Sequence, residues 1–120
     1  MSIEKKLRSF KYALTGIAIA WREEFNFRFD VVWAFLTLGL AWFLRLSETE
    51  FLVILFMIGF VLTAETFNTA LEELCDKFQP THDPHIGKIK DLAAGAVLIS
   101  SITAFIVGCV IFIPHLTLFL

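Results

Sequence analysis

The apolar run Phe51-Leu-Val-Ile-Leu-Phe-Met-Ile-Gly-Phe-Val-Leu-Thr-Ala64 continues without a break into the polar stretch Glu65-Thr-Phe-Asn-Thr-Ala-Leu-Glu-Glu-Leu-Cys-Asp76. In the second stretch, polar side chains at i, i+3, i+7 and i+11 fall within roughly 80° of one another on a helix. They are Glu65, Asn68, Glu72 and Asp76. A helix in a protein core would carry leucine or isoleucine along such a stripe. A carboxylate near the end of a membrane span is costly, so this stripe indicates a functional site.

The composition predicts an all-α membrane protein with a single domain over residues 1–120. Hydrophobic residues make up 58% of the 120-residue chain, whereas soluble domains usually contain about 45–50%. We expect transmembrane helices at 28–46, 50–72 and 92–115. Apolar residues recur at three- and four-residue steps over 3–24, which predicts an amphipathic surface helix within residues 1–27. The net charge of −2 argues against a nucleic-acid partner.

The distribution of lysine and arginine predicts the orientation. Every Lys and Arg except Arg45 falls before the first span or between the second and third spans. The positive-inside rule therefore places the N-terminus and the Glu72–Asp91 loop in the cytoplasm. The charged segment Met1–Phe10 lacks the apolar core of a cleavable signal peptide. Polar residues before and at the start of the first span join this cytoplasmic side: Glu23, Glu24, Asn26, Arg28 and Asp30.

Carboxylates, an amide and lysines at a lipid surface are the parts of phosphoryl transfer. Magnesium takes oxygen ligands, a separate carboxylate can act as general base, and lysine can pair with a polyphosphate. A plainer interpretation makes Glu23, Glu24 and Arg28 ordinary ion pairs of a helix and gives Lys88 and Lys90 a role in topology alone. It leaves the carboxylate of Glu65 unexplained. No phosphate-binding loop motif and no zinc-ligand pattern is present.

Three blocks of sequence resemble the small prokaryotic diacylglycerol kinase family, which includes the undecaprenol kinases. Residues 65–76 are similar to the family signature E-x-x-N-[ST]-A-[IL]-E-x-x-x-D. The other two blocks are Glu24-Phe-Asn-Phe-Arg28 and Lys88-Ile-Lys-Asp-Leu-Ala-Ala-Gly-Ala-Val97. The resemblance covers roughly residues 5–112, with the blocks in the family's order.

The resemblance implies a homotrimer of three-span subunits with active sites shared between subunits. Glu65 would be the catalytic base, and Glu24 and Glu72 would hold Mg²⁺ against ATP. The residues expected to bind or orient the nucleotide are Tyr12, Asn68, Asp76, Lys90 and Asp91. The residues expected to bind the lipid are Trp21, Asn26 and Arg28. A family histidine has two possible counterparts, His82 and His85, and a basic residue near the N-terminus is either Lys5 or Arg8.

The function predicted from these residues is ATP-dependent phosphorylation of a membrane lipid hydroxyl in the bacterial inner (cytoplasmic) membrane. The lipid is undecaprenol or diacylglycerol, and the sequence blocks favour undecaprenol. The alternative is a small proton-coupled transporter with Glu65 as its titrating carboxylate, although carboxylates at one interface and the lack of an inverted repeat argue against it. A purely structural membrane subunit leaves the polar stripe unexplained. Consumption of ATP in micelles separates the kinase from the transporter.

Overall fold

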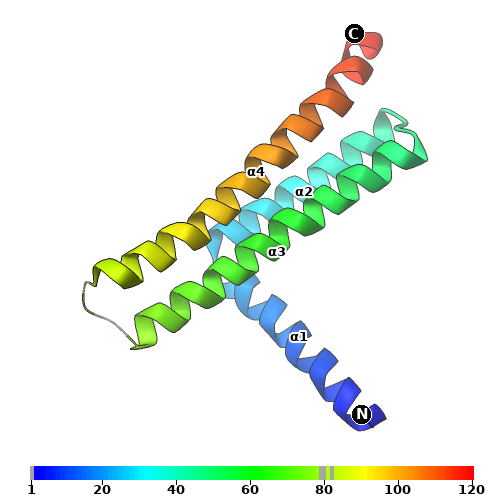
Figure 1. The fold of residues 1–120 in the computed structure, drawn as a ribbon. Helices are drawn as coiled ribbons and strands as arrows, with labels where there is room; N and C mark the ends of the chain where they lie inside the picture. The colour runs from blue at the N-terminus through cyan, green and yellow to red at the C-terminus, as the bar shows by residue number, and fades with distance from the viewer. Residues whose placement is uncertain (1, 79–80, 82) are drawn as a thin grey trace.

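The computed structural model describes residues 2–78, 81 and 83–120, and within these residues it contains four α-helices and no strand. They are α1 (Ile3–Glu23), α2 (Phe25–Phe43), α3 (Glu48–Phe78) and α4 (Pro84–Phe119). Helices α2, α3 and α4 run side by side, whereas α1 points away from this bundle (Figure 1). The predicted all-α class is confirmed.

Two helices of the described chain, α3 and α4, are long and apolar enough to cross a membrane. Their most apolar windows have mean hydropathies of 1.9 and 2.7, and only 11% and 6% of these windows are buried. Core helices of soluble proteins would be mostly buried, so these two present their apolar side chains outward. Helix α2 packs along α3 but carries Arg28 and Asp30 in its first turns, which lower its hydropathy. A third span at α2 stays a prediction.

The break between α1 and α2 falls at Glu24, earlier than the end of the surface segment expected at residue 27. The backbone of Glu24 is extended, with φ −112° and ψ 111°. Its N–H still donates to the carbonyl of Ala20 at 3.0 Å, which closes α1. Ala20 is also the one buried residue of α1, all of which the structure describes. Helix α1 therefore touches the bundle near its C-terminal end and is exposed elsewhere.

The turn between α2 and α3 is a Schellman motif followed by a capping box. Arg45 adopts the left-handed conformation (φ 57°), and the N–H of Leu46 reaches back to the carbonyl of Ala41 at 3.1 Å. Ser47 then begins α3: its hydroxyl accepts from the N–H of Glu50, and the carboxylate of Glu50 accepts from the N–H of Ser47. The short link between these helices therefore has its backbone groups satisfied locally.

The far end of α3 is joined to α4 by the loop at 79–83, of which residues 79, 80 and 82 lie outside the described part. Asp83 caps α4, because its carboxylate accepts from the N–H groups of His85 and Ile86. Pro84 occupies the first turn, where its missing N–H costs nothing. Helix α4 therefore begins well before residue 92, where the third span was expected.

The buried core of a single chain is small and lies near the α2–α3 turn. It is centred on Ala41, Ile54 and Phe112. Most large apolar side chains are exposed in the single chain. Lipid or other copies of the chain must cover them, because water contact with so many apolar groups is unfavourable.

Candidate active site

Glu65 is the most buried charged residue of the described chain, with 5% of its surface exposed. It lies on the face of α3 that other helices cover. A buried carboxylate normally needs a partner, because desolvation disfavours its charge. Instead, three other carboxylates lie close enough to repel the negative charge of Glu65. They are Asp30, Glu24 and Glu72, and the repulsion from Asp30 is the strongest. Four carboxylates from the α1–α2 break, α2 and α3 thus share one region.

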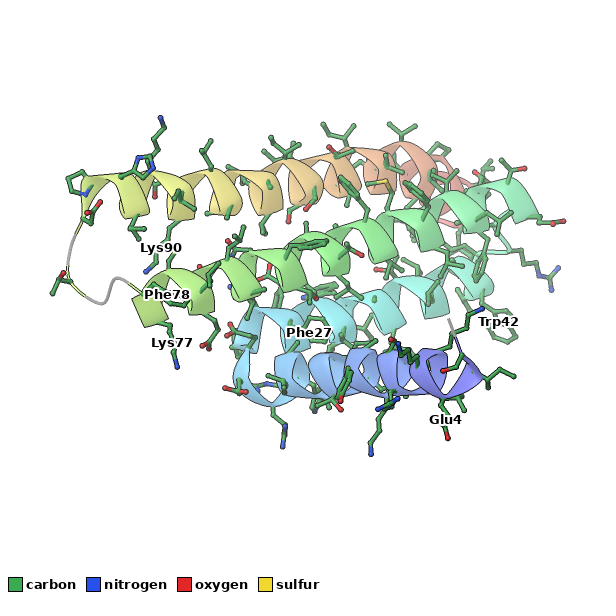
Figure 2. The ribbon with its side chains drawn as sticks, turned by 60° about the horizontal axis from the view of Figure 1, so that its bottom comes forward. Glu4, Phe27, Trp42, Lys77, Phe78 and Lys90 are labelled. Carbon is green, nitrogen blue, oxygen red and sulfur yellow. The ribbon has the colours of Figure 1, made fainter. Side chains whose placement is uncertain are left out.

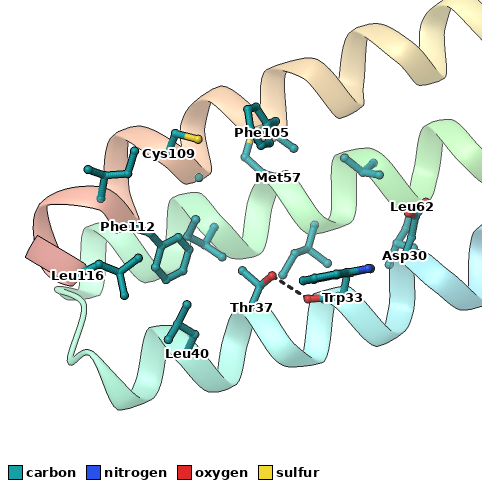
Figure 3. A pocket seen from close by; sticks show the side chains of 17 residues that line it. Asp30, Trp33, Thr37, Leu40, Met57, Leu62, Phe105, Cys109, Phe112 and Leu116 are labelled. Carbon is teal, nitrogen blue, oxygen red and sulfur yellow. Dashed lines mark hydrogen bonds between the residues drawn. The ribbon is translucent and has the colours of Figure 1, made fainter. Parts of the chain in front are cut away.

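Asp30 is a further candidate for the site, and its sequence position alone assigned it no role. It lines the end of an apolar groove between α2, α3 and α4 that has a volume of about 430 Å³ (Figure 3). Trp33 lies near it, while Phe112 and Leu116 line the opposite end. The signal that could have found Asp30 is its position directly before the first apolar segment. An ionisable residue at a membrane span is a functional candidate by default.

Glu24 lies at the break between α1 and α2. The side chain of Arg28 spans the same break with hydrogen bonds to the end of α1. The Nη1 of Arg28 donates to the carbonyl of Trp21 at 2.8 Å and to the carbonyl of Arg22 at 2.9 Å. These carbonyls belong to the last turn of α1 and have no partner further along that helix. A cation is also favourable at the C-terminal end of a helix dipole. We refer to residues 20–28 as the elbow.

Glu72 and Asn68 form a second polar pair on α3, one helical turn apart. The Nδ2 of Asn68 donates to Oε1 of Glu72 at 3.3 Å. The Oδ1 of Asn68 is buried and has no hydrogen-bond partner among the described residues. An amide held in this way has a free acceptor that a bound molecule or ion can satisfy. The polar stripe predicted along α3 therefore contains one pair of side chains, Asn68 and Glu72, that a hydrogen bond already holds in place.

The side chains near Glu65 fit a magnesium ion that is held jointly by the protein and by a phosphate-bearing substrate. In the described part of the chain, no three His, Cys, Asp or Glu side chains lie close enough to hold a metal alone. Magnesium typically binds through one or two carboxylates together with substrate phosphates and water. Glu24 and Glu72 are two such carboxylates near Glu65. The unpartnered oxygen of Asn68 adds a polar acceptor beside Glu72.

Lys90 and Asp76 join α4 to α3 at the end of the bundle that carries the 79–83 loop. The Nζ of Lys90 donates to Oδ1 of Asp76 at 2.5 Å. Lys90 precedes the span expected at 92–115, and this hydrogen bond raises the pKa of its ammonium above the ordinary value of 10.5. Lys90 points toward α3, whereas Lys77 points away from α4 (Figure 2). Lys90 is thus a fixed cation at neutral pH.

The remaining predicted residues are not brought together with Glu65 in a single chain. Tyr12 is 71% exposed and Trp21 is 44% exposed on α1. Asn26 and Asp91 are exposed on α2 and α4. Trp21 lines a second groove of about 1000 Å³ between α1, α2 and α3. The two candidate basic residues and one of the two candidate histidines, Lys5, Arg8 and His85, are exposed as well. His82 lies outside the described residues.

The apolar helices, two of them long enough to cross a membrane, define an integral membrane protein, and the buried Glu65 with its polar neighbours is the candidate site. The family model for prokaryotic diacylglycerol kinase matches residues 11–112. The chain belongs to this family.

Curated relatives agree with the family and name two lipids. The chain is 34% identical to the undecaprenol kinase of Bacillus subtilis over 95% of its own length and 93% of that protein. It is 35% identical to the diacylglycerol kinase of Synechocystis over 92% of its length, although it spans 63% of that longer protein. It is 27% identical to the diacylglycerol kinase of Escherichia coli over 91% of its length and 89% of that protein. The chain is therefore a membrane lipid kinase, for which ATP is the expected co-substrate.

Proposed function

We propose that this chain transfers the γ-phosphate of ATP to the primary hydroxyl of a membrane lipid, and that the lipid is undecaprenol rather than diacylglycerol. The observation that carries the proposal is the buried Glu65 among three further carboxylates, because it provides a base beside groups suited to a polyphosphate and its metal. The site would face the cytoplasm of the bacterial inner membrane.

Glu65 acts as the general base in this proposal. Its carboxylate takes the proton from the lipid hydroxyl while that oxygen attacks the γ-phosphorus of ATP. The bond between the γ-phosphorus and the bridging oxygen breaks, ADP leaves, and the lipid phosphate remains in the membrane. Burial of Glu65 excludes water, which would otherwise compete as the acceptor of the phosphoryl group.

Glu24 and Glu72 would hold Mg²⁺, which when bound neutralises phosphate charge. Asn68 orients Glu72 through the hydrogen bond between their side chains. Lys90 supplies positive charge toward the nucleotide, and Asp76 orients its ammonium. Tyr12 and Asp91 would complete the nucleotide side. Trp21 and Asn26 would contact the lipid at the elbow, outside the groove that begins at Asp30, because Trp21 lines the groove between α1, α2 and α3.

A homotrimer with three spans in each subunit is the assembly we propose. In one chain Tyr12 of α1 and Asp91 of α4, both nucleotide residues in this proposal, are exposed. Sites shared between subunits would bring such residues together, and association would cover the exposed apolar faces of α2, α3 and α4.

The groove that begins at Asp30 supports undecaprenol as the lipid. Among the described residues that line it, Asp30 is the one charged residue, and the hydroxyl of Thr37 donates to the carbonyl of Trp33 at 2.7 Å. Diacylglycerol brings two ester groups whose carbonyl oxygens need donors, whereas a polyprenol brings only apolar chain behind its hydroxyl. The other lining donors are the indole N–H of Trp33 and the weak thiol of Cys109, and a groove that is otherwise apolar favours the polyprenol.

Transfer of labelled γ-phosphate from ATP by purified protein tests the proposal, with undecaprenol and diacylglycerol offered in parallel micelles. We expect label in undecaprenol. Label confined to diacylglycerol would overturn the choice of lipid, and label in neither lipid with folded protein and Mg²⁺ present would overturn the activity. Consumption of ATP that depends on added lipid excludes the proton-coupled transporter.

A further inference from the structure

The elbow at residues 20–28 decides where Glu24 lies, because packing does little to hold α1. Ala20 is the one buried residue of this fully described helix, so few apolar contacts oppose its rotation about the bundle. The extended backbone of Glu24 connects α1 to α2, and rotation about it would move the Glu24 carboxylate relative to α3. Another interaction must therefore fix the angle between the two helices.

Arg28 provides that interaction across the elbow. It lies in the first turns of α2, and its N–H donates to the carbonyl of Glu24 at 3.2 Å. Its Nη1 donates backward to the carbonyls of Trp21 and Arg22 in the last turn of α1. One side chain therefore connects the segments on both sides of Glu24. The adjacent Phe27 is buried, with 6% of its surface exposed, and anchors the start of α2 in the bundle.

We propose that Arg28 is a positioning residue that locks the elbow and thereby holds Glu24 against the carboxylates of α3. This inference rests on the proposed function insofar as Glu24 holds the metal. It gives Arg28 a different role from the lipid contact that the family resemblance implies. The Nη1 group bound to the carbonyls of Trp21 and Arg22 is occupied within the elbow, and this contact keeps the geometry around Glu24 fixed.

The test compares Arg28→Met with Arg28→Lys and with the control Lys6→Gln. Methionine keeps the apolar stem but has no charge and no donor. Lysine keeps the charge but reaches less far, so it should restore part of the lost function. Lys6 is exposed on α1 away from the elbow, so its variant removes a cation from the same helix without touching the lock. Folding of each variant is checked by size-exclusion chromatography.

Amide hydrogen exchange in micelles without ligands tests whether the hydrogen bonds of Arg28 hold the elbow closed. In Arg28→Met we expect exchange over residues 20–28 to become at least about tenfold faster, because the variant loses both charge-assisted hydrogen bonds to the end of α1. Arg28→Lys should fall between this variant and the wild type, and Lys6→Gln should match the wild type. Unchanged exchange in Arg28→Met would show that the contacts seen in the structure do not hold the elbow.

Metal binding and kinetics then separate positioning from lipid contact. Binding of Mn²⁺ in the presence of a non-hydrolysable ATP analogue, measured by electron paramagnetic resonance, should weaken about tenfold in Arg28→Met. The kcat should fall about ten- to a hundredfold, whereas the KM for lipid should stay within about twofold. A raised KM for lipid with unchanged Mn²⁺ binding would overturn the proposal in favour of direct lipid contact.

The two proposals fail in different ways. Absence of phosphate transfer by the wild-type protein would overturn the proposed function, but the exchange and Mn²⁺ measurements would still decide the role of Arg28. Faster exchange in Arg28→Met with unchanged Mn²⁺ binding and unchanged kcat would show that Arg28 holds the elbow without positioning Glu24. That result would overturn the inference and leave the proposed kinase activity intact.

Discussion

Lys90 on α4 donates a hydrogen bond to Asp76 on α3, and the two residues are 14 positions apart in the chain. Both side chains are substantially exposed, at 37% and 65%. Exposed ion pairs contribute little to stability, because water screens them and ordering long side chains is unfavourable. The pair is therefore better explained by a task in the site than by a need of the fold.

Replacing Lys90 by methionine should raise the KM for ATP at least about tenfold, the loss expected for one charge-assisted hydrogen bond. The thermal unfolding midpoint should hardly change. The control is Lys77→Met, which removes a nearby cation that points away from α4 (Figure 2). Steady-state kinetics at varied ATP, together with thermal unfolding, check both statements. Equal KM values for the two variants would remove Lys90 from the nucleotide site.

Glu65→Gln should lower kcat by about 10²- to 10⁴-fold, the usual contribution of a positioned general base. Glutamine has nearly the same shape but cannot accept the hydroxyl proton, so the helices should still assemble. Glu73→Gln is the matched control, because Glu73 lies on the same helix and is exposed. Labelled-phosphate transfer and size-exclusion chromatography measure the two properties. Wild-type turnover in Glu65→Gln would refute the assignment of the base.

Asn68→Ala should raise the Mg²⁺ concentration for half-maximal activity by roughly tenfold. The amide of Asn68 holds Glu72 through a 3.3 Å hydrogen bond, and groups that orient a metal ligand typically change affinity by about 10–100-fold. Thr66→Ala serves as the control, because the exposed hydroxyl of Thr66 donates to the carbonyl of Leu62 in its own helix. Activity is measured against Mg²⁺ at saturating ATP. An unaltered Mg²⁺ dependence in Asn68→Ala would argue that Glu72 holds no metal.

The opposite end of the bundle should affect stability without affecting catalysis. The Nε2 of His115 lies 3.1 Å from both carboxylate oxygens of Glu50. This contact joins α4 to the first turn of α3. His115→Ala should lower the thermal unfolding midpoint, and Glu50→Ala should lower it further because the capping box with Ser47 is lost too. The kcat at 25 °C should be unchanged, because Glu50 lies on the order of 22 Å from Glu65 along α3.

The control for this pair is Glu48→Gln, which alters an exposed carboxylate in the same helical turn. Thermal unfolding in detergent compares the variants. If His115→Ala and Glu48→Gln unfolded at the same temperature, the contact between α3 and α4 would have no measurable role.

Arg45→Gly should stabilise the chain by about 1 kcal/mol, because a side chain in the left-handed region is strained and glycine is not. Arg45 has φ 57° in the Schellman turn between α2 and α3. Unfolding in sodium dodecyl sulfate titrations measures the change. Since Arg45 is the only cation expected outside the cytoplasm, topology is checked in the same samples by accessibility of an engineered cysteine. A less stable Arg45→Gly variant would mean that the arginine side chain makes contacts that outweigh the strain.

The sequence determined the class of the molecule and predicted much of the candidate site, because both follow from local periodicity. The three- and four-residue spacing over 3–24 predicted a helix that the structure places at Ile3–Glu23. The stripe of Glu65, Asn68 and Glu72 follows from helical geometry alone, and the structure pairs two of these residues. The family signature required no tertiary information at all.

The tertiary structure decided what these residues meet. The charge of Asp30 on α2 repels that of Glu65 on α3. The side chain of Arg28 on α2 donates to a carbonyl of α1, and His115 contacts Glu50, which is 65 positions away in the chain. None of these relationships has a sequence period, because each depends on the angle and register at which helices pack. Hydrophobic patterning says which faces are apolar, but it leaves open which polar side chains meet at the ends of those faces.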